Sequence, residues 1–369
     1  MNLPIPTPAI VIDLAVVKRN IQRMAEYAKK HNLQLRPHTK THKSHFFAMM
    51  QLVEGACGLT VAKVEEAQSM FKVWEDLLIG YPVVDSYRTQ TAAWLAKQGN
   101  IRVTMDSLEF NGVYGLPLLN QMAQSIHSTI GVLVDVDVGY HRTGVQTPED
   151  ALELAKQIDA SSNLRLDGIF CYYGHLSTYQ PKKQKPHLKK VSEKLRDIIS
   201  LWKEHGLEAK IVSGGSTPTA FQSHFIPELT EIRPGTYIFY DRNSISSGCC
   251  TIEDCAARIY TTVVSTSLPG KAVVDAGSKT LTSDRLIHNP DEAGYGLVVD
   301  YPEAKITRLT EEHGEIDIRK CSSIPKIGDR LYIIPNHICP CINLQNKVWV
   351  LRLSGKYDQI KIHARGMVI

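Results

Sequence analysis

Short runs of aliphatic and β-branched residues alternate with amphipathic segments over about the first two-thirds of the chain. Ala9–Ile12 precedes a segment over 14–30 in which apolar residues recur at helical spacing. The nearly continuous β-formers of Gly131–Val136 predict a fully buried strand over 130–138. About eight such units predict a parallel (β/α)8 barrel, and a doubly wound sheet is the structural rival. Further helices are expected over 62–70, 89–98, 148–158 and 186–205, and the last strands of the series over 210–213 and 231–234.

The pattern changes after Ile245, where helical periodicity is weak and turn residues separate short strand candidates. This texture predicts a β domain of about 120 residues joined to the barrel. The boundaries that we predict are residues 12–244 for the barrel, with 1–11 and 245–369 forming the β domain. The strand candidates are 258–267, 271–275, 297–300, 306–309, 330–334 and 347–353, and 311–314 is expected to be a polar hairpin tip.

Composition narrows the class of protein without pointing to a function. The chain has 369 residues, of which 43% are hydrophobic and 22% charged, and its net charge of +4 gives no argument for nucleic-acid binding. No secretory signal and no membrane-spanning apolar run are visible, and the basic stretch 181–185 is expected to be a solvated loop. Eight irregularly spaced cysteines favour reduced thiols and a cytoplasmic protein over a disulfide framework.

The densest chemistry lies in a basic segment close to the N-terminus. Lys40 is expected in the second strand or just beyond it, next to Arg36, His38, His42 and Lys43. Neighbouring positive charge favours the neutral amine that a Schiff base requires. A basic loop that binds solvent or an anion is the alternative interpretation, and composition alone does not decide between the two.

A glycine-rich turn, Ser213-Gly214-Gly215-Ser216-Thr217, directly follows a predicted strand. Two glycines allow successive backbone amides to point at one oxyanion, and the hydroxyls add donors. Barrels often hold phosphate at the carboxyl end of a late strand, although an ordinary turn followed by a helix cap is the alternative. The patterns GxxxxGK[ST] and GxGxxG are absent, so neither a P-loop nor a dinucleotide-binding fold is supported.

His337 and Cys339 form a possible metal pair near the other end of the chain. Alternate residues of an extended segment share a face, so the imidazole and the thiol would point the same way, with Cys341 as a possible third ligand. Two protein ligands leave positions open for water or substrate, as catalytic zinc requires. A buried structural pair is the commoner alternative.

Two further predicted strands end in polar residues at the mouth of the barrel. Arg142 could stabilise an anionic oxygen or lie beside a ring nitrogen, and a structural ion pair with Asp135 or Asp137 is the alternative. Tyr173 and His175 end another strand and should face the same mouth, although a core tyrosine would be simpler.

Together these motifs resemble the D-threonine aldolase and D-serine dehydratase family, which are pyridoxal-phosphate enzymes of the alanine racemase fold class. The resemblance spans nearly the whole chain, and the lysine motif combined with the H-x-C motif is specific. The matching stretches are TPAIVID at 7–13, RPHTKTHK at 36–43, DVGYHRTGV at 137–145, YYGH at 172–175, SGGSTPT at 213–219, RPGTYIFYD at 233–241, VDAGSKTLTSD at 274–284, EEHG at 311–314 and PNHICPCINL at 335–344.

The resemblance implies a role for each candidate residue. Lys40 would form the Schiff base with pyridoxal phosphate and, together with Tyr173 and His175, act on the substrate. The metal ligands would be His337 and Cys339, binding zinc, with manganese or magnesium as alternatives. The residues implied in cofactor binding are Lys40, Arg142, Ser213, Gly214, Gly215, Ser216, Thr217, Tyr237 and Asp241. A homodimer is also implied, in which the β domain of the partner completes each site; residues 275–284 are candidates for that contribution.

The favoured function is dehydration of a D-configured β-hydroxy amino acid, D-serine, D-threonine or 3-hydroxyaspartate, to a 2-oxo acid and ammonia. The alternative is retro-aldol cleavage to glycine and an aldehyde, as in D-threonine aldolase. Cys339 favours the dehydratase because, in the family, many aldolases place aspartate at that position. An amino-acid racemase and a non-catalytic pyridoxal-phosphate-binding protein rank below both, because the metal pair argues against them.

Overall fold

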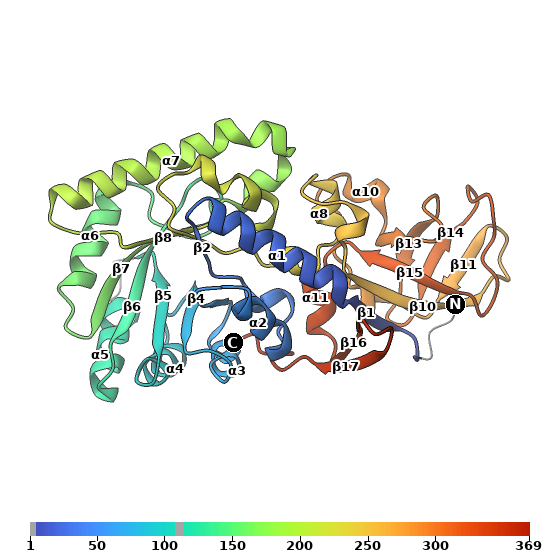
Figure 1. Ribbon diagram of the computed structural model, residues 1–369, viewed down its shortest axis with the longest axis horizontal. Helices are drawn as coiled ribbons and strands as arrows, with labels where there is room; N and C mark the ends of the chain where they lie inside the picture. Colours follow the sequence, from blue (N-terminus) through green and yellow to red (C-terminus); the bar gives the residue numbers. More distant parts are fainter. Residues whose placement is uncertain (1–4, 108–113) are drawn as a thin grey trace. The chain divides into compact units, whose positions relative to one another are not determined.

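The computed structural model describes residues 5–107 and 114–369 (Figure 1). The chain divides into two compact units, each built on its own sheet. The first, called here the barrel unit, consists of Arg23–Lys40, Phe47–Gly235 and Met367–Ile369. The second, called the β unit, consists of the described residues up to Gln22 together with Thr41–Phe46 and Thr236–Gly366. The domain boundaries given above at residues 12 and 244 stay predictions.

Eight parallel strands form the sheet of the barrel unit, in the spatial order β2-β9-β8-β7-β6-β5-β4-β3. The sheet closes on itself because the chain around β2 also pairs with the chain around β3, through an N–H bond from Thr60 to Pro37 and a bridge between His38 and Thr60. The predicted (β/α)8 barrel is therefore confirmed. The strands are β2 (Gln34–Leu35), β3 (Leu59–Val61), β4 (Asp76–Pro82), β5 (Asn100–Met105), β6 (Ile130–Val136), β7 (Leu164–Cys171), β8 (Ile211–Gly214) and β9 (Glu231–Ile232).

Local sequence explains these elements. Every residue of β6 is buried, as its run of β-formers predicts. Helix α6 begins with a capping box between Thr147 and Asp150 and has Pro148 in its first turn. The helices that alternate with the strands along the chain are α1 (Leu14–Lys30), α2 (His45–Val53), α3 (Val64–Met70), α4 (Ser86–Ala96), α5 (Leu116–Ile126), α6 (Pro148–Asp159) and α7 (Pro181–Glu204).

Helix α7 begins five residues earlier than expected, so the interpretation of 181–185 as a loop is wrong. Pro181 occupies the first helical position, where its missing N–H costs nothing. The side chain of Gln184 is buried and donates to the carbonyl groups of Leu176 and Tyr179 at 3.2 and 3.0 Å. The buried amide of Gln184 thus holds the first turn of α7 in place, whereas the lysines of this segment had suggested a solvated loop.

Three short 3-10 helices follow strands of the barrel unit. η1 (Thr39–Thr41) comes after β2, η2 (Gly174–Thr178) after β7 and η3 (Thr217–Phe225) after β8. Each occupies the region after the carboxyl end of a strand, the end at which barrels of this kind hold their ligands.

The β unit contains a mixed sheet of nine strands with the order β13-β14-β11-β10-β1-β16-β17, in which β15 pairs with β10 and β12. The strands are β1 (Ala9–Asp13), β10 (Ala257–Ser265), β11 (Lys271–Val274), β12 (Gly296–Val298), β13 (Lys305–Leu309), β14 (Gly314–Asp317), β15 (Arg330–Pro335), β16 (Lys347–Leu351) and β17 (Tyr357–Lys361). Its short helices are η4 (Thr236–Ile238), α8 (Arg242–Ser246), η5 (Ile252–Asp254), α9 (Ser278–Leu281), α10 (Pro290–Ala293) and α11 (Ile338–Asn343).

Three features of the β unit differ from the sequence expectation. The first strand of the alternating series, β1, pairs with β10 and β16 and so belongs to the mixed sheet, not to the barrel. β14 and β17 were not predicted, because charged and polar residues dominate both segments; antiparallel pairing with β11 and β16 defines them. The hairpin tip at 311–314, in contrast, lies where it was expected, between β13 and β14.

Among the described helices, none combines the length and apolarity needed to cross a membrane.

Candidate active site

The turn after β8 is the first candidate feature of the barrel unit. Gly215 has a φ of +91°, a conformation that favours glycine, and a Cβ atom on Gly214 would lie 2.8 Å from the Leu229 side chain. The backbone conformation therefore favours glycine at 215, and close packing against side chains favours it at 214. Ser216 and Thr217 follow, at the start of η3. The turn thus brings main-chain N–H groups and hydroxyls to the carboxyl end of a parallel strand.

A buried hydroxyl lies beside this turn. The Tyr173 hydroxyl has no hydrogen-bond partner among the residues that the structure describes, and a Cβ atom on Gly215 would lie 3.6 Å from it. The side chain is completely buried, and burial raises the pKa of Tyr173 above its ordinary value. Buried polar atoms normally have partners. An unsatisfied donor beside a glycine-rich turn therefore fits the phosphate group of a bound cofactor.

Ser213 is engaged with protein side chains. Its hydroxyl donates to Glu231 Oε1 at 2.5 Å and accepts a hydrogen bond from Arg233. Arg233 also donates to the Cys171 carbonyl at 2.8 Å, and its guanidinium carbon lies 3.7 Å from the centroid of the Phe170 ring. Sequence reasoning gave this fully buried cation no role; its only signal was its place in the motif RPGTYIFYD.

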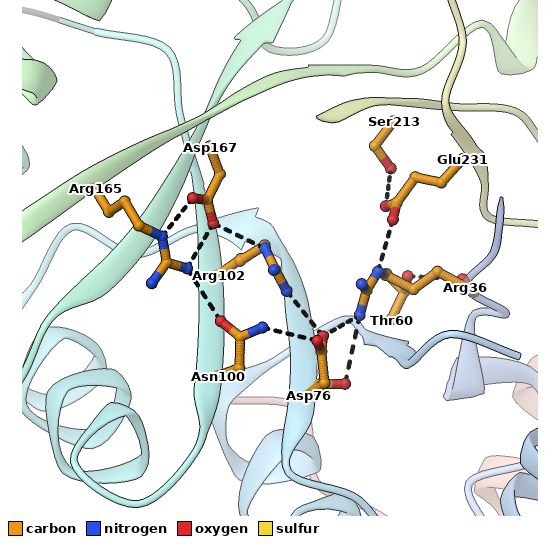
Figure 2. A network of polar contacts seen from close by, with 9 residues as sticks. All are labelled: Arg36, Thr60, Asp76, Asn100, Arg102, Arg165, Asp167, Ser213 and Glu231. Carbon is orange, nitrogen blue, oxygen red and sulfur yellow. Dashed lines mark hydrogen bonds and ion pairs between the residues drawn. The ribbon is translucent and has the colours of Figure 1, made fainter. Parts of the chain in front are cut away.

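A chain of ion pairs continues from Glu231 through the amino-terminal part of the barrel strands (Figure 2). Glu231 pairs with Arg36 at 3.0 Å, and Arg36 pairs with Asp76. Arg102 then joins Asp76 to Asp167, at 2.8 Å on each side, and Arg165 also pairs with Asp167. The network contains three arginines and three carboxylates, so its formal charges balance. In barrels of this kind, residues near the amino-terminal ends of the strands contribute to stability and not to catalysis.

Arg36 therefore does not act as an unpaired cation beside Lys40. Burial alone would lower the pKa of Arg36, but the carboxylate of Glu231 raises it above its ordinary value. The guanidinium remains charged, and the carboxylates of Glu231 and Asp76 balance its charge.

Lys40 lies in η1, just beyond β2, and its side chain is exposed. The segment is held by Thr39, whose hydroxyl lies 3.1 Å from the Thr60 carbonyl and 2.8 Å from Glu66 Oε1. The backbone N–H of Lys40 lies 3.4 Å from His38 Nδ1. The backbone of η1 is thus fixed while the amine is left accessible, an arrangement suited to a reactive lysine.

Arg142 lies in the loop after β6. The carboxylate of Asp137 shapes this loop by accepting three backbone N–H groups of the following turn at 2.9–3.0 Å. Partial burial would raise the pKa of Asp137, but these hydrogen bonds lower it to about 2. The guanidinium carbon of Arg142 lies 5.1 Å from the Tyr140 ring and 4.8 Å from the Tyr172 ring. Stacking against aromatic rings leaves the N–H edges of an arginine available to an anion.

His175 and Arg142 come from neighbouring loops. A Cβ atom on Gly139, in the loop after β6, would lie 3.3 Å from the His175 imidazole in η2. His175 Nδ1 is buried without a hydrogen-bond partner in the described part of the chain. Burial lowers the pKa of His175, which favours the neutral imidazole. The predicted residues of the barrel unit therefore follow the carboxyl ends of its strands, except Ser213 and Gly214, which are the last two residues of β8.

The predicted metal pair lies in the β unit. His337 Nδ1 lies 2.7 Å from Asp284 Oδ2, and the imidazole also contacts the Cys339 thiol. Cys339 Sγ lies 3.2 Å from the hydroxyl of Thr41, the residue that follows Lys40 in the sequence. Burial would raise the pKa of Cys339, but the His337 imidazole lowers it below its ordinary value. A carboxylate on one ring nitrogen and a polarised thiol beside the ring form a donor set that fits zinc.

The reason given above for the proximity of His337 and Cys339 is wrong. The segment is not extended: His337 is the N-cap of α11, and Cys339 lies in its first turn. Cys341 does not face the pair, because its thiol donates to the carbonyl groups of Leu281 and His337. In the described part of the chain no group of three histidine, cysteine or carboxylate side chains could hold a metal ion. The pair therefore offers two ligands and leaves other coordination positions open.

Tyr237 and Asp241, the other two implied cofactor contacts, also lie in the β unit. Tyr237 is fully buried in η4, and Thr236 Oγ1 lies 3.8 Å from Cys339 Sγ. Asp241 is the N-cap of α8, and its carboxylate is buried. Asp241 contacts the segment of the metal pair, because its carboxylate accepts a hydrogen bond from the backbone N–H of Ile338.

Asp284 is a functional candidate that the sequence indicated with a different role. The range 275–284 was expected to contribute to the site of a partner subunit. Within its own chain, Asp284 binds His337, and Asp275 accepts hydrogen bonds from Thr7 and Thr261 at 2.6 Å each. No spacing rule links two residues that lie 53 positions apart, so the pairing required the fold.

Comparison with known proteins now adds to this geometry. Residues 12–243 match the family described as alanine racemase, N-terminal domain, and residues 256–351 match the putative serine dehydratase domain. The chain therefore belongs to the D-threonine aldolase and D-serine dehydratase family of the alanine racemase fold class, as its motifs predict.

Individual relatives cover nearly the whole chain. D-Threonine aldolase from Arthrobacter sp is 28% identical, with 98% of this chain and 93% of the relative covered. D-threo-3-Hydroxyaspartate dehydratase from Delftia sp. (strain HT23) is 31% identical, with 91% and 92% covered. The predicted class of enzyme, a lyase, is confirmed by these matches.

Solved structures support the fold over the same length. The crystal structure of D-threonine aldolase from Filomicrobium marinum has a TM-score of 0.89 at 29% identity and covers 99% of this chain and 97% of that one. A cysteine-to-alanine variant of D-threo-3-hydroxyaspartate dehydratase, in the metal-free form, has a TM-score of 0.88 at 26% identity and covers 97% of each chain.

Proposed function

We propose that the protein is a pyridoxal-phosphate- and zinc-dependent lyase of D-configured β-hydroxy amino acids, and that dehydration to a 2-oxo acid and ammonia is its main reaction. The observation that carries the proposal is the pairing of His337 with both Asp284 and the Cys339 thiol. Such a pair is not needed by a racemase or by a cofactor carrier, whereas a lyase needs to activate a hydroxyl group.

The barrel unit offers the residues that would hold the cofactor. Lys40 would bind its aldehyde carbon, and the turn from Gly214 to Thr217 would bind its phosphate with help from the unsatisfied Tyr173 hydroxyl. Arg142 would lie beside the ring. When bound, pyridoxal phosphate supplies an electron sink for the bonds at Cα of an amino acid.

The side chains around this position suit the movement of a proton at Cα. The Lys40 amine is accessible and can take that proton when it is neutral. His175 is favoured in its neutral form and can accept or return a proton nearby. Tyr173 is held fully buried, which keeps its phenol protonated and available as a donor.

In the β unit, His337 and Cys339 would bind the metal. Asp284 holds His337 Nδ1, so that Nε2 is left for coordination. A thiolate ligand favours zinc over manganese or magnesium. When bound, zinc supplies Lewis-acid activation of a hydroxyl group.

Retro-aldol cleavage is the second candidate, because D-threonine aldolase from Arthrobacter sp matches over nearly the full length of the chain. Cys339 favours dehydration, since many aldolases of the family place aspartate there. The two reactions differ in which bond breaks, Cβ–O or Cα–Cβ, and so in their products.

The test is to incubate the protein, loaded with pyridoxal phosphate and zinc, with D-threonine and to identify the products. 2-Oxobutyrate and ammonia would support the dehydratase, and glycine with acetaldehyde would replace it by the aldolase. D-Serine and 3-hydroxyaspartate are assayed in parallel. If the protein converts none of the three substrates, the proposal is overturned.

The homodimer with shared sites and the cytoplasmic location are also proposed. All eight cysteines are free thiols, which supports a reducing compartment.

A further inference from the structure

One buried carboxylate of the β unit serves two helices. Asp241 is 2% exposed, and its Oδ1 accepts from the backbone N–H of Ser244 at 2.9 Å and from the Ser244 hydroxyl at 2.7 Å. These are the N-cap bonds of α8. Its Oδ2 accepts from the backbone N–H of Ile338 at 3.2 Å, which is the first residue of α11.

The position of Ile338 makes the second contact important. Ile338 lies between His337 and Cys339, so a hydrogen bond to its N–H fixes the backbone between the two metal ligands. The first N–H groups of a helix have no partner within the helix. A carboxylate that accepts one of them sets where α11 begins, and therefore how far the imidazole and the thiol are rotated from each other.

The preceding residue is held by the same helix and by the segment that contains Asp284. The Asn336 carbonyl accepts from the backbone N–H of Asn243, in α8, at 3.1 Å. The Asn336 side chain donates to the Asp284 carbonyl at 3.0 Å and to the Gly294 carbonyl at 2.8 Å. Contacts with the backbone therefore fix the chain on both sides of His337: Asn243, in α8, supplies one, and the side chain of Asp241, the N-cap of α8, supplies the other.

We propose that Asp241 is a positioning residue for the metal pair: by capping α8 and α11 together, it holds His337 and Cys339 in the arrangement that binds zinc. The inference rests on the proposed zinc site and goes beyond it, since it gives Asp241 a role through the backbone of Ile338, between the two ligands, instead of the cofactor contact that the resemblance implied. Removal of a partner of this kind weakens metal affinity by about 10- to 100-fold in other metal sites.

The variant Asp241→Asn tests the proposal selectively. Asparagine caps a helix about as well as aspartate, so its oxygen can keep the contacts with Ser244. Its amide nitrogen would then face the N–H of Ile338, two donors in opposition. Zinc affinity is measured by competition with a chromophoric chelator, and the geometry of the pair by the thiolate-to-cobalt absorption of the Co²⁺-substituted protein.

We expect zinc affinity to fall about 10- to 100-fold in Asp241→Asn, with an altered cobalt spectrum. Asp254→Asn is the matched control, because Asp254 is also a buried capping aspartate of the β unit, in the capping box of η5 with Thr251. It should leave zinc affinity and the cobalt spectrum unchanged.

Unchanged zinc affinity in Asp241→Asn, or an equal loss in both variants, would overturn the proposal. If Asp241→Asn does not fold, Ser244→Ala replaces it: loss of one hydrogen bond to the carboxylate should weaken zinc binding by roughly 2- to 10-fold, and no change would count against the role of Asp241. These readouts do not use turnover, so wild-type protein that binds zinc but converts no substrate would contradict the proposed function and leave this inference standing.

Discussion

Buried charge is arranged differently in the barrel network and in the metal pair. In the network, Arg36 and Glu231 are each 4% exposed and pair with each other, and every further charge meets an opposite one (Figure 2). In the β unit, the His337 imidazole lies between a carboxylate and a thiol, and the buried Cys339 thiol donates a hydrogen bond to the Thr41 hydroxyl. A set of charges that satisfies itself needs no ligand, whereas a thiol and an imidazole become a strong donor pair once both lose their protons.

The barrel unit contains the same contrast within its own strands. Near their amino-terminal ends the polar side chains are paired, while beyond the carboxyl ends the Tyr173 hydroxyl and His175 Nδ1 lack partners within the described residues. A bound ligand could supply partners for these two atoms, because buried polar atoms normally have them.

The largest expected effect is on catalysis, at the lysine that lies beyond the carboxyl end of β2. Lys40→Ala should lower kcat/KM by more than about 10⁴-fold, because both the covalent attachment and the base at Cα are lost. Unfolding temperature should change little, since the side chain is exposed. Steady-state assays with D-threonine and D-serine measure the effect, and exposed Lys320→Ala is the control. Turnover that survives in Lys40→Ala would remove this lysine from the mechanism.

The next effect separates the metal from the cofactor. His337→Ala should lose bound zinc and at least about 10²-fold of the rate, because the activation of the hydroxyl is lost. The absorbance of bound pyridoxal phosphate should stay the same. Metal content by mass spectrometry and rates with and without added zinc check this, with the exposed hairpin residue His313→Ala as the control. A full rate in metal-stripped wild-type protein would contradict the role of zinc.

The network should respond in stability rather than in chemistry. Glu231→Gln removes one of the two carboxylates that pair with the buried Arg36 cation and leaves Asp76 as the other. Breaking a buried ion pair typically destabilises by about 3–5 kcal/mol, so we expect a loss near the lower end of that range. Denaturant unfolding measures the loss. The exposed pair of Arg319 with Asp317 is the control, and Arg319→Ala should leave the unfolding midpoint unchanged. A midpoint shift of equal size in both variants would show that burial is not what makes the network stabilising.

The smallest effect concerns a carboxylate outside any full ion pair. Burial raises the pKa of Asp135 from 3.8 to about 6, so its protonated form stabilises the fold below pH 3.8, and that contribution is lost as the pH rises through 6. Asp135→Asn should therefore be more stable than the wild type by on the order of 3 kcal/mol at pH 7.5. The gain should vanish near pH 4. Unfolding curves across this pH range check the sign, and a gain that is independent of pH would contradict it.

Sequence alone predicted the barrel because its signal is local: continuous β-formers such as those of β6 and capped amphipathic segments such as α6 need no tertiary information. β14 and β17 escaped prediction because polar edge segments become strands only through their partners. The start of α7 escaped it because Gln184 turns inward, a property that composition does not carry.

The residues of the candidate site also fall into two groups, those that the sequence indicates and those that only the fold reveals. The glycine turn at 214–215 and the residues after the strands are motifs and could be found in the sequence. Asp284, Arg233 and the capping role of Asp241 could not, since each depends on a partner that lies far away in the sequence. The pair His337 and Cys339 was found for a partly wrong reason, because the start of a helix, not a strand, brings the two side chains together.

The most direct test of the account is to count pyridoxal phosphate and zinc in the same preparations of wild type, Lys40→Ala and His337→Ala. We predict one of each per wild-type chain, zinc without covalently attached cofactor in Lys40→Ala, and cofactor without zinc in His337→Ala. Loss of both groups together in either variant, or of neither, would contradict the assignment of the two groups to separate sets of side chains.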